Sequence, residues 1–196
     1  MTPIVPNHFR PRVFCIGMNK TGTSSLNAAF KLLGLRSLHH SRIAEPAIAR
    51  AIAEGQPLLS SIDGYDCYTD APFYRHYQAL DRQYPDSRFI LNTRDTDAWV
   101  RSRIAHDRRW NKRRRPANAA PRHCDPRRLR ATKERYELAI QDYFAAEGRR
   151  HRFLVLNVPA GDGWRPLCGF LGLPVPRDAE GREQPFPFKN RTELKT

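Results

Sequence analysis

Arg12-Val-Phe-Cys-Ile-Gly-Met-Asn-Lys-Thr-Gly-Thr-Ser-Ser25 decides how this chain begins to fold. The apolar run that follows Arg12 ends at Gly17, which predicts a buried strand that meets a turn. Apolar residues then recur at helical spacing from Leu26 to Leu33, and Gly34 stands where a helix-ending glycine is expected. A strand, a glycine loop and a helix form the opening unit of a parallel α/β sheet.

The loop in this unit is suited to binding a phosphate group. Backbone N–H groups and the partial positive charge of a helix N-terminus favour an anion there. Lys20 adds a full charge, Gly22 permits close approach of the backbone, and hydroxyl donors come from Thr21, Thr23, Ser24 and Ser25. Because Lys20 precedes Gly22, the order differs from a Walker A loop, which disfavours ATP or GTP hydrolysis. The alternative is an ordinary strand–turn–helix junction with a surface lysine.

The rest of the chain repeats the alternation of strands and helices. We expect strands at 35–39, 88–93 and 153–158, and helices at 43–53, 72–84, 96–104, from 126 onward and 164–171. This order predicts a three-layer α/β sandwich with a mainly parallel central sheet, in a single domain over residues 1–196. A basic loop or lid is expected at about 106–125, and a surface-wrapping tail at about 174–196.

A second phosphate-binding element follows the predicted strand at 88–93. Arg94 ends that strand, and Ser102 lies eight residues later in the next helix. A phosphate at the carboxyl edge of the sheet would meet the guanidinium and this hydroxyl. The alternative is a surface ion pair between Arg94 and Asp95 or Asp97.

These two elements resemble the phosphate-binding segments of the sulfotransferases that use 3′-phosphoadenosine 5′-phosphosulfate (PAPS). Lys-Thr-Gly-Thr-Ser-Ser at 20–25 is similar to their 5′-phosphosulfate loop, and they bind the 3′-phosphate with an Arg and a Ser at the spacing of Arg94 and Ser102. Further segments resemble the short bacterial and lower-eukaryotic branch: Tyr68-Thr-Asp-Ala-Pro72, Tyr84-Pro85, Trp99, Gly163-Trp-Arg-Pro-Leu-Cys-Gly-Phe-Leu171 and Pro185-Phe-Pro-Phe-Lys-Asn190. The resemblance implies a P-loop NTPase-like fold and metal-free transfer of a sulfuryl group from PAPS to a hydroxyl or amine. The nucleotide product would be 3′-phosphoadenosine 5′-phosphate (PAP).

The resemblance also implies roles for catalytic residues. Lys20 would stabilise the oxygens of the leaving group, and Asp70 would be the general base, where cytosolic members carry a histidine. Alternatively, Asp70 caps a helix that begins near Pro72. His40 and its neighbour His39 follow the predicted second strand and are the alternative bases.

Some positions match the family loosely or depart from it. Lys189 and Arg191 resemble the late basic loop that meets the 3′-phosphate, although a solvated tail is the alternative. Ser25 stands where cytosolic members have a tryptophan that stacks on adenine. Tyr68 replaces a catalytic lysine, which leaves Lys20 as the main positive charge near the leaving oxygen.

The net charge of +14 indicates an anionic partner without identifying it. The Arg-rich run at 101–115, with Trp110 inside it, suits binding of an anionic polymer, a lid over the acceptor, or a solvated basic loop. No recognisable nucleic-acid module surrounds it, so we expect no dedicated nucleic-acid partner. The alternative function is a non-catalytic basic protein that binds a nucleotide or an anionic polymer. A nucleotide-dependent phosphotransferase is disfavoured, because neither the Walker A order nor a carboxylate motif for Mg²⁺ is present.

Length and composition set the remaining expectations. A chain of 196 residues with 40% hydrophobic residues suits one folded core. Its four cysteines lack metal-ligand spacing, which favours reduced, buried thiols and no structural zinc. No apolar run suits a membrane span or a signal peptide, so a cytoplasmic location is expected. The acceptor, a small molecule, lipid or glycan, and the oligomeric state stay open.

Overall fold

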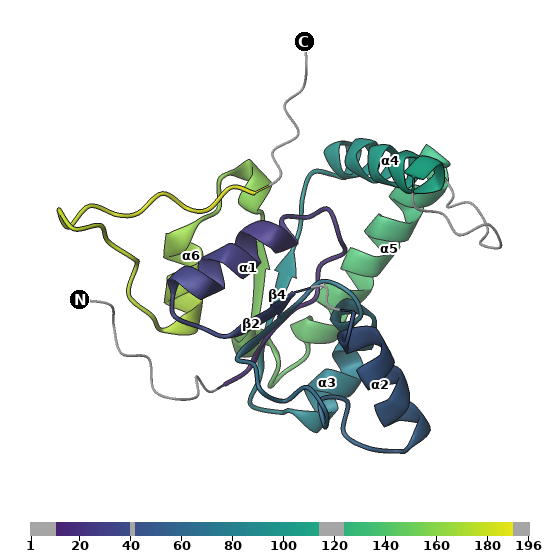
Figure 1. The fold of residues 1–196 in the computed structure, drawn as a ribbon, viewed down its shortest axis with the longest axis horizontal. Coiled ribbons are helices and arrows are strands. Elements are labelled where there is room, and N and C mark those ends of the chain that lie inside the picture. The colour runs from purple at the N-terminus through teal and green to yellow at the C-terminus, as the bar shows by residue number, and fades with distance from the viewer. Residues whose placement is uncertain (1–10, 40–41, 114–123, 190–196) are drawn as a thin grey trace, which may run out of the picture. The chain divides into compact units, whose positions relative to one another are not determined.

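The computed structural model describes residues 11–39, 42–113 and 124–189. The described residues form two compact units, one drawn from 1–93 and 151–196 and the other from 94–150 (Figure 1). No helix within the described ranges has both the length and the apolar character needed to cross a bilayer.

The first unit is built on a sheet of five parallel strands within the described residues. Its order is β2-β3-β1-β4-β5, with β1 in the centre. The strands are β1 (Val13–Cys15), β2 (Ser37–His39), β3 (Cys67–Thr69), β4 (Arg88–Asn92) and β5 (Phe153–Leu156). Because all strands run the same way, the loops that follow them meet at one carboxyl edge. The predicted α/β class with a parallel sheet is confirmed.

Helices cover both faces of this sheet. They are α1 (Thr23–Leu32), α2 (Ala44–Ala53), α3 (Tyr77–Gln83) and α6 (Trp164–Leu171), with short 3₁₀ helices at η1 (Phe73–His76), η2 (Arg150–Arg152) and η3 (Val158–Ala160). In Figure 1, α1 and α6 lie on one side of the sheet, and α2 and α3 lie on the other. The first unit therefore has the three layers that the sequence predicts.

Alternating side chains of the strands supply two apolar layers. Val13 and Cys15 of β1 pack into the core that α1 and α6 cover. On the opposite face, Phe14 stacks on Tyr68 at 5.3 Å between ring centroids and lies 5.4 Å from Phe89. Tyr68 is fully buried, and its hydroxyl donates to the carbonyl of Ile62 at 3.0 Å. Tyr68 is thus part of the core.

Strand β3 is an element that sequence patterning does not predict. It is only three residues long and stands between Asp66 and Asp70, so its local composition is typical of a loop. The Asp66 carboxylate is nevertheless buried, because it accepts from the backbone N–H of Arg36 at 2.8 Å and from that residue's guanidinium at 3.1–3.2 Å. A contact with a residue far away in the sequence allows this strand to form inside the sheet.

The second unit contains two long helices, α4 (Thr96–Arg113) and α5 (Pro126–Ala145). Asp125 caps α5 by accepting from the N–H of Arg127 at 2.9 Å. Between the helices, Lys133 is buried, bonds to Glu137 at 2.7 Å and donates to the hydroxyl of Thr96 at 3.4 Å.

The structure extends α4 beyond the predicted end at residue 104. Arginine is a good helix former even without apolar periodicity, and Arg103 bonds to Asp107 one turn later at 2.8 Å. Residues 106–113, expected as part of a loop or lid, are therefore helical. The rest of that expected segment, up to residue 123, lies outside the described residues.

The four cysteines should differ sharply in reactivity toward iodoacetamide at about pH 8. Cys15, Cys67 and Cys168 are buried, and burial raises the pKa of each thiol, that of Cys168 to about 11. Their thiolate fraction is therefore small at this pH, whereas Cys124 is partly exposed. Peptide mass spectrometry should find Cys124 alkylated first and the other three only after denaturation. Equal labelling of all four in the folded protein would contradict this packing.

Candidate functional site

The loop after β1 has an unusual backbone. Lys20 has φ 73° and Gly22 has φ 95°, both in the left-handed region. A side chain in that region costs about 1–2 kcal/mol, and such residues concentrate at functional sites. Gly22 is the N-cap of α1, and no side chain caps this helix. The first turn of α1 therefore presents the partial positive charge of its N–H groups at the loop.

The side-chain amide of Asn92 forms hydrogen bonds with two residues of this loop. It accepts from the N–H of Gly17 at 3.0 Å and donates to the hydroxyl of Thr21 at 2.6 Å. Thr21 in turn donates to the carbonyl of Met18 at 2.5 Å and is fully buried. The Thr21 hydroxyl, expected to bind cofactor, is thus part of the internal bracing of the loop. The sequence analysis did not select Asn92. The signal that could have indicated its role is a polar residue at the end of an apolar strand.

Asp70 lies directly beside the first turn of α1. Its Oδ2 accepts from the Thr23 hydroxyl at 3.1 Å, and its Oδ1 accepts from the N–H of Ala71 at 2.8 Å. The residue is 8% exposed and has φ 72°. It does not cap η1, whose N-cap is Pro72 with no side-chain hydrogen bond. Of the two roles considered for Asp70, the structure thus excludes the helix cap and places the carboxylate at the loop.

His39 reaches the loop from the end of β2. Its Nδ1 lies 2.8 Å from the hydroxyl of Thr69, the residue opposite it on β3. Its Nε2 lies 3.4 Å from the hydroxyl of Ser24 in α1. The structure therefore brings this histidine to the predicted phosphate-binding residues. His40, the other alternative base, lies outside the described residues.

The tail returns to the loop at Lys189. Its backbone N–H donates to the Ser25 hydroxyl at 3.0 Å, and Ser25 is 3% exposed. The preceding tail is anchored by Trp164, whose indole N–H donates to the carbonyl of Gln184 at 2.7 Å and whose ring lies 4.8 Å from that of Phe186. Arg191, predicted to act with Lys189, lies outside the described residues.

Arg94 and Ser102 belong to the 94–150 unit, so their approach to the loop stays a prediction from the sequence. Arg94 follows Thr93, whose N–H bonds to the carbonyl of Leu156 at 2.9 Å and extends the β4–β5 pairing. The two carboxylates considered as ion-pair partners of Arg94 form other contacts within that unit. Asp95 accepts from the N–H of Ala98 at 2.8 Å, and Asp97 pairs with Arg130.

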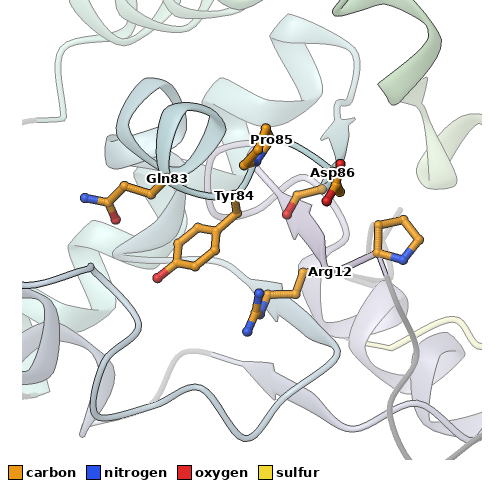
Figure 2. Close-up of a pocket in the computed structure, with 7 residues that line it drawn as sticks. Arg12, Gln83, Tyr84, Pro85 and Asp86 are labelled. Carbon is orange, nitrogen blue, oxygen red and sulfur yellow. The ribbon is translucent and has the colours of Figure 1, made fainter.

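A hollow of about 460 Å³ lies at the opposite edge of the sheet (Figure 2). It is lined by residues next to the starts of β1 and β4, namely Pro11, Arg12, Gln83, Tyr84, Pro85, Asp86 and Ser87. The Arg12 guanidinium pairs with Asp63 and lies 4.9 Å from the centre of the Tyr84 ring. Because ligands of parallel sheets bind at the carboxyl ends of the strands, this hollow is not our candidate site.

The described residues contain no cluster of three or more His, Cys, Asp or Glu side chains that could hold a metal ion. The candidate site brings together the glycine loop with Lys20, the hydroxyl groups of the first turn of α1, the Asp70 carboxylate and the His39 imidazole. These groups are suited to binding an anion and to accepting a proton.

A family model described as a sulfotransferase domain matches residues 12–150 and 104–194. The chain belongs to this sulfotransferase family. It is also 26% identical over 201 residues to the "Ava biosynthesis cluster protein M" of Aspergillus versicolor, a match that covers 84% of this chain and 77% of that relative. Membership in the family gives the reaction class, sulfuryl transfer, for the chain as a whole.

Replacing Gly17 with alanine should disrupt the bracing of this sulfotransferase loop. A Cβ at Gly17 would lie 1.8 Å from the backbone oxygen of Asn92, so strand or loop must shift. We expect a loss of about 1–3 kcal/mol or more in the free energy of unfolding, measured by urea denaturation. Gly169→Ala in α6 is the control, since a Cβ there meets nothing within 4 Å and alanine favours a helix. A Gly17→Ala variant as stable as Gly169→Ala would contradict the bracing.

Proposed function

We propose that this protein transfers the sulfuryl group of PAPS to a hydroxyl or amine of an acceptor and releases PAP. The observation that carries the proposal is the loop after β1, with Lys20 in a left-handed conformation between a buried strand and an uncapped helix N-terminus. Family membership over nearly the whole chain supports the reaction class. The donor PAPS is our inference from the anion-binding chemistry of that loop and from the resemblance.

Each residue of the loop would have a definite task in this reaction. Transfer breaks the bond between sulfur and the phosphate oxygen, forms a bond between sulfur and the acceptor atom, and leaves the electron pair on the 5′-phosphate. Lys20 would stabilise that developing charge, and the backbone at Gly22 would hold the phosphate oxygens. The Ser24 hydroxyl lies in the first turn of α1, where it would orient the phosphosulfate. The buried Thr23 hydroxyl already donates to Asp70, so Thr23 would contact the phosphosulfate through its backbone N–H.

Other residues would support the nucleotide indirectly or through its 3′-phosphate. Thr21 and Ser25 are both buried, and their hydroxyls already bond to Asn92 and to the Lys189 backbone. We therefore assign them to loop shape, with any contact to PAPS through their backbone. Our proposed partners of the 3′-phosphate are Arg94, Ser102, Lys189 and Arg191.

The alternative function, binding of an anionic polymer without catalysis, is favoured by one feature of the second unit. Arg101, Arg108, Arg109 and Lys112 are exposed along α4. Such a basic stripe attracts polyanions with salt-sensitive affinity. The same stripe would also suit an acidic small-molecule, lipid or glycan acceptor of a sulfotransferase.

Calorimetric titration with PAP tests the nucleotide site. We expect micromolar binding by the wild type and a roughly ten- to hundredfold loss in Lys20→Ala and in Arg94→Ala, since a hydrogen bond to a charged group contributes about 1.5–3 kcal/mol. The matched controls are Lys31→Ala, an exposed lysine in the last turn of α1, and Arg101→Ala, an exposed arginine of α4. Equal affinity in all four variants would overturn the proposed site.

Radiolabelled PAPS offered with a panel of phenols and amines separates catalysis from binding alone. A sulfotransferase should produce a labelled acceptor whose formation depends on Lys20. Retained PAP binding with no labelled product from any acceptor, together with salt-sensitive binding of a polyanion, would favour the alternative.

A further inference from the structure

We propose that His39 is the general base that removes the acceptor's proton, and that Asp70 is a positioning residue that holds the phosphate-binding loop. This assignment rests on the proposed sulfotransferase function and extends it. Both residues lie at the carboxyl edge of the sheet, His39 at the end of β2 and Asp70 directly after β3.

Hydrogen bonding at Thr69 determines where the proton of the His39 ring lies. The Thr69 hydroxyl donates to the carbonyl of Leu38 at 3.4 Å, and the same oxygen lies 2.8 Å from His39 Nδ1. A hydroxyl has one proton, and we assign that of Thr69 to the Leu38 carbonyl, so that its oxygen acts as acceptor toward the ring. Nδ1 then carries the hydrogen, and Nε2 of the neutral ring has the lone pair that a base requires.

That lone pair faces the phosphate-binding loop. Nε2 is 3.4 Å from the hydroxyl of Ser24, in the first turn of α1. Thr69 is fully buried, so the support of the ring on the Nδ1 side is fixed. An acceptor that entered beside Ser24 would meet Nε2 close to the group being transferred, which is the geometry that general-base catalysis requires.

The order of strands makes this approach consistent with binding of the nucleotide. Strand β1, which leads into the loop, lies between β3 and β4. Arg94, the proposed partner of the 3′-phosphate, follows β4, whereas His39 ends β2 on the other side of β1. A nucleotide bound at Lys20 that extends toward the carboxyl end of β4 would leave the β2–β3 side of the loop for the acceptor. In-line displacement requires the acceptor opposite the leaving phosphate.

The contacts of Asp70 suit a different task. Both of its oxygens already accept hydrogen bonds, from the Thr23 hydroxyl and from the N–H of Ala71. Protonating either oxygen would weaken one of these bonds and release part of the loop. Asp70 is therefore better suited to fixing the position of Thr23 than to receiving a proton in each turnover.

Proton transfer to His39 accompanies sulfuryl transfer in the proposed step. The acceptor O–H or N–H bond breaks, and its proton moves to Nε2 of His39 as the acceptor atom bonds to sulfur. The bond from sulfur to the phosphate oxygen breaks, and its electron pair leaves with PAP. His39 becomes an imidazolium that still donates from Nδ1 to Thr69, and it later returns the proton to water.

One test needs no acceptor and no nucleotide. Long-range nitrogen–proton correlation spectra of the nitrogen-labelled protein distinguish the two neutral tautomers, and His39→Gln identifies the signal. We expect the hydrogen on Nδ1 in the wild type and a mixture of tautomers in Thr69→Val. A hydrogen on Nε2 in the wild type would overturn the assignment.

A second test distinguishes the general base from the positioning residue. It measures the transfer rate with a phenol or amine of the panel above that the wild type sulfates, and it measures PAP affinity by calorimetry in parallel. His39→Ala should keep PAP affinity close to wild type, lose about a hundredfold or more in transfer rate, and recover part of that rate with added imidazole. Asp70→Asn should weaken PAP binding and show no rescue by imidazole or formate. Full transfer by His39→Ala, or rescue of Asp70→Ala by formate, would overturn the assignment alone. A wild type that fails to bind PAP would overturn the proposed function, and this assignment with it.

Discussion

The amide of Asn92 is the contact on which the geometry of the site depends. The residue is fully buried, and both ends of its side chain bond to the loop, at Gly17 and at Thr21. Losing one partner would leave a buried polar group unsatisfied, at a cost of about 1–3 kcal/mol. The close approach requires the missing Cβ of Gly17. Strand β4 and the loop after β1 thus specify one another, and Lys20 is held in its left-handed conformation between them.

Three adjacent hydroxyl residues in the first turn of α1 contact three different segments of the chain. Thr23 bonds to Asp70 after β3, Ser24 lies against His39 of β2, and Ser25 accepts from the backbone of Lys189 in the tail. Successive residues of a helix point about 100° apart, so three adjacent side chains meet three different neighbours. A run of hydroxyl residues that resembles a phosphate-binding motif in sequence therefore serves in part to assemble the site.

Local pattern was sufficient for the elements whose signals are local. The apolar run after Arg12 predicts β1, and α6 begins and ends where the sequence indicates. Strand β3 was not predicted, because it forms through pairing with β1 and β2, and the partners of its flanking residues Asp66 and Asp70 are 30 and 47 residues away. Likewise, α4 continues past residue 104 because arginine favours a helix even where no apolar face is visible in the sequence.

The same limit applies to the candidate site. Lys20 and Asp70 could be selected from motif order, and the structure places Asp70 at the loop that carries Lys20. The bracing by Asn92 and the contacts of the two His39 ring nitrogens could not be predicted, because each depends on hydrogen bonds between segments far apart in the sequence. A sequence shows which residues are able to titrate, whereas the chain of donors and acceptors around them decides which nitrogen or oxygen is available.

Tyr68 shows how the core constrains the chemistry at the edge. The family resemblance pairs this position with a catalytic lysine, whereas the Tyr68 side chain stacks on Phe14 and bonds to the Ile62 carbonyl. Burial raises the pKa of this phenol, which opposes its ionisation, and the ring supplies no cation at the loop. In the reaction that we propose, stabilisation of the leaving oxygen is assigned to Lys20 and the helix N-terminus. A strained lysine conformation is reasonable at this position, because a charge held in place beforehand stabilises a transition state without reorganisation.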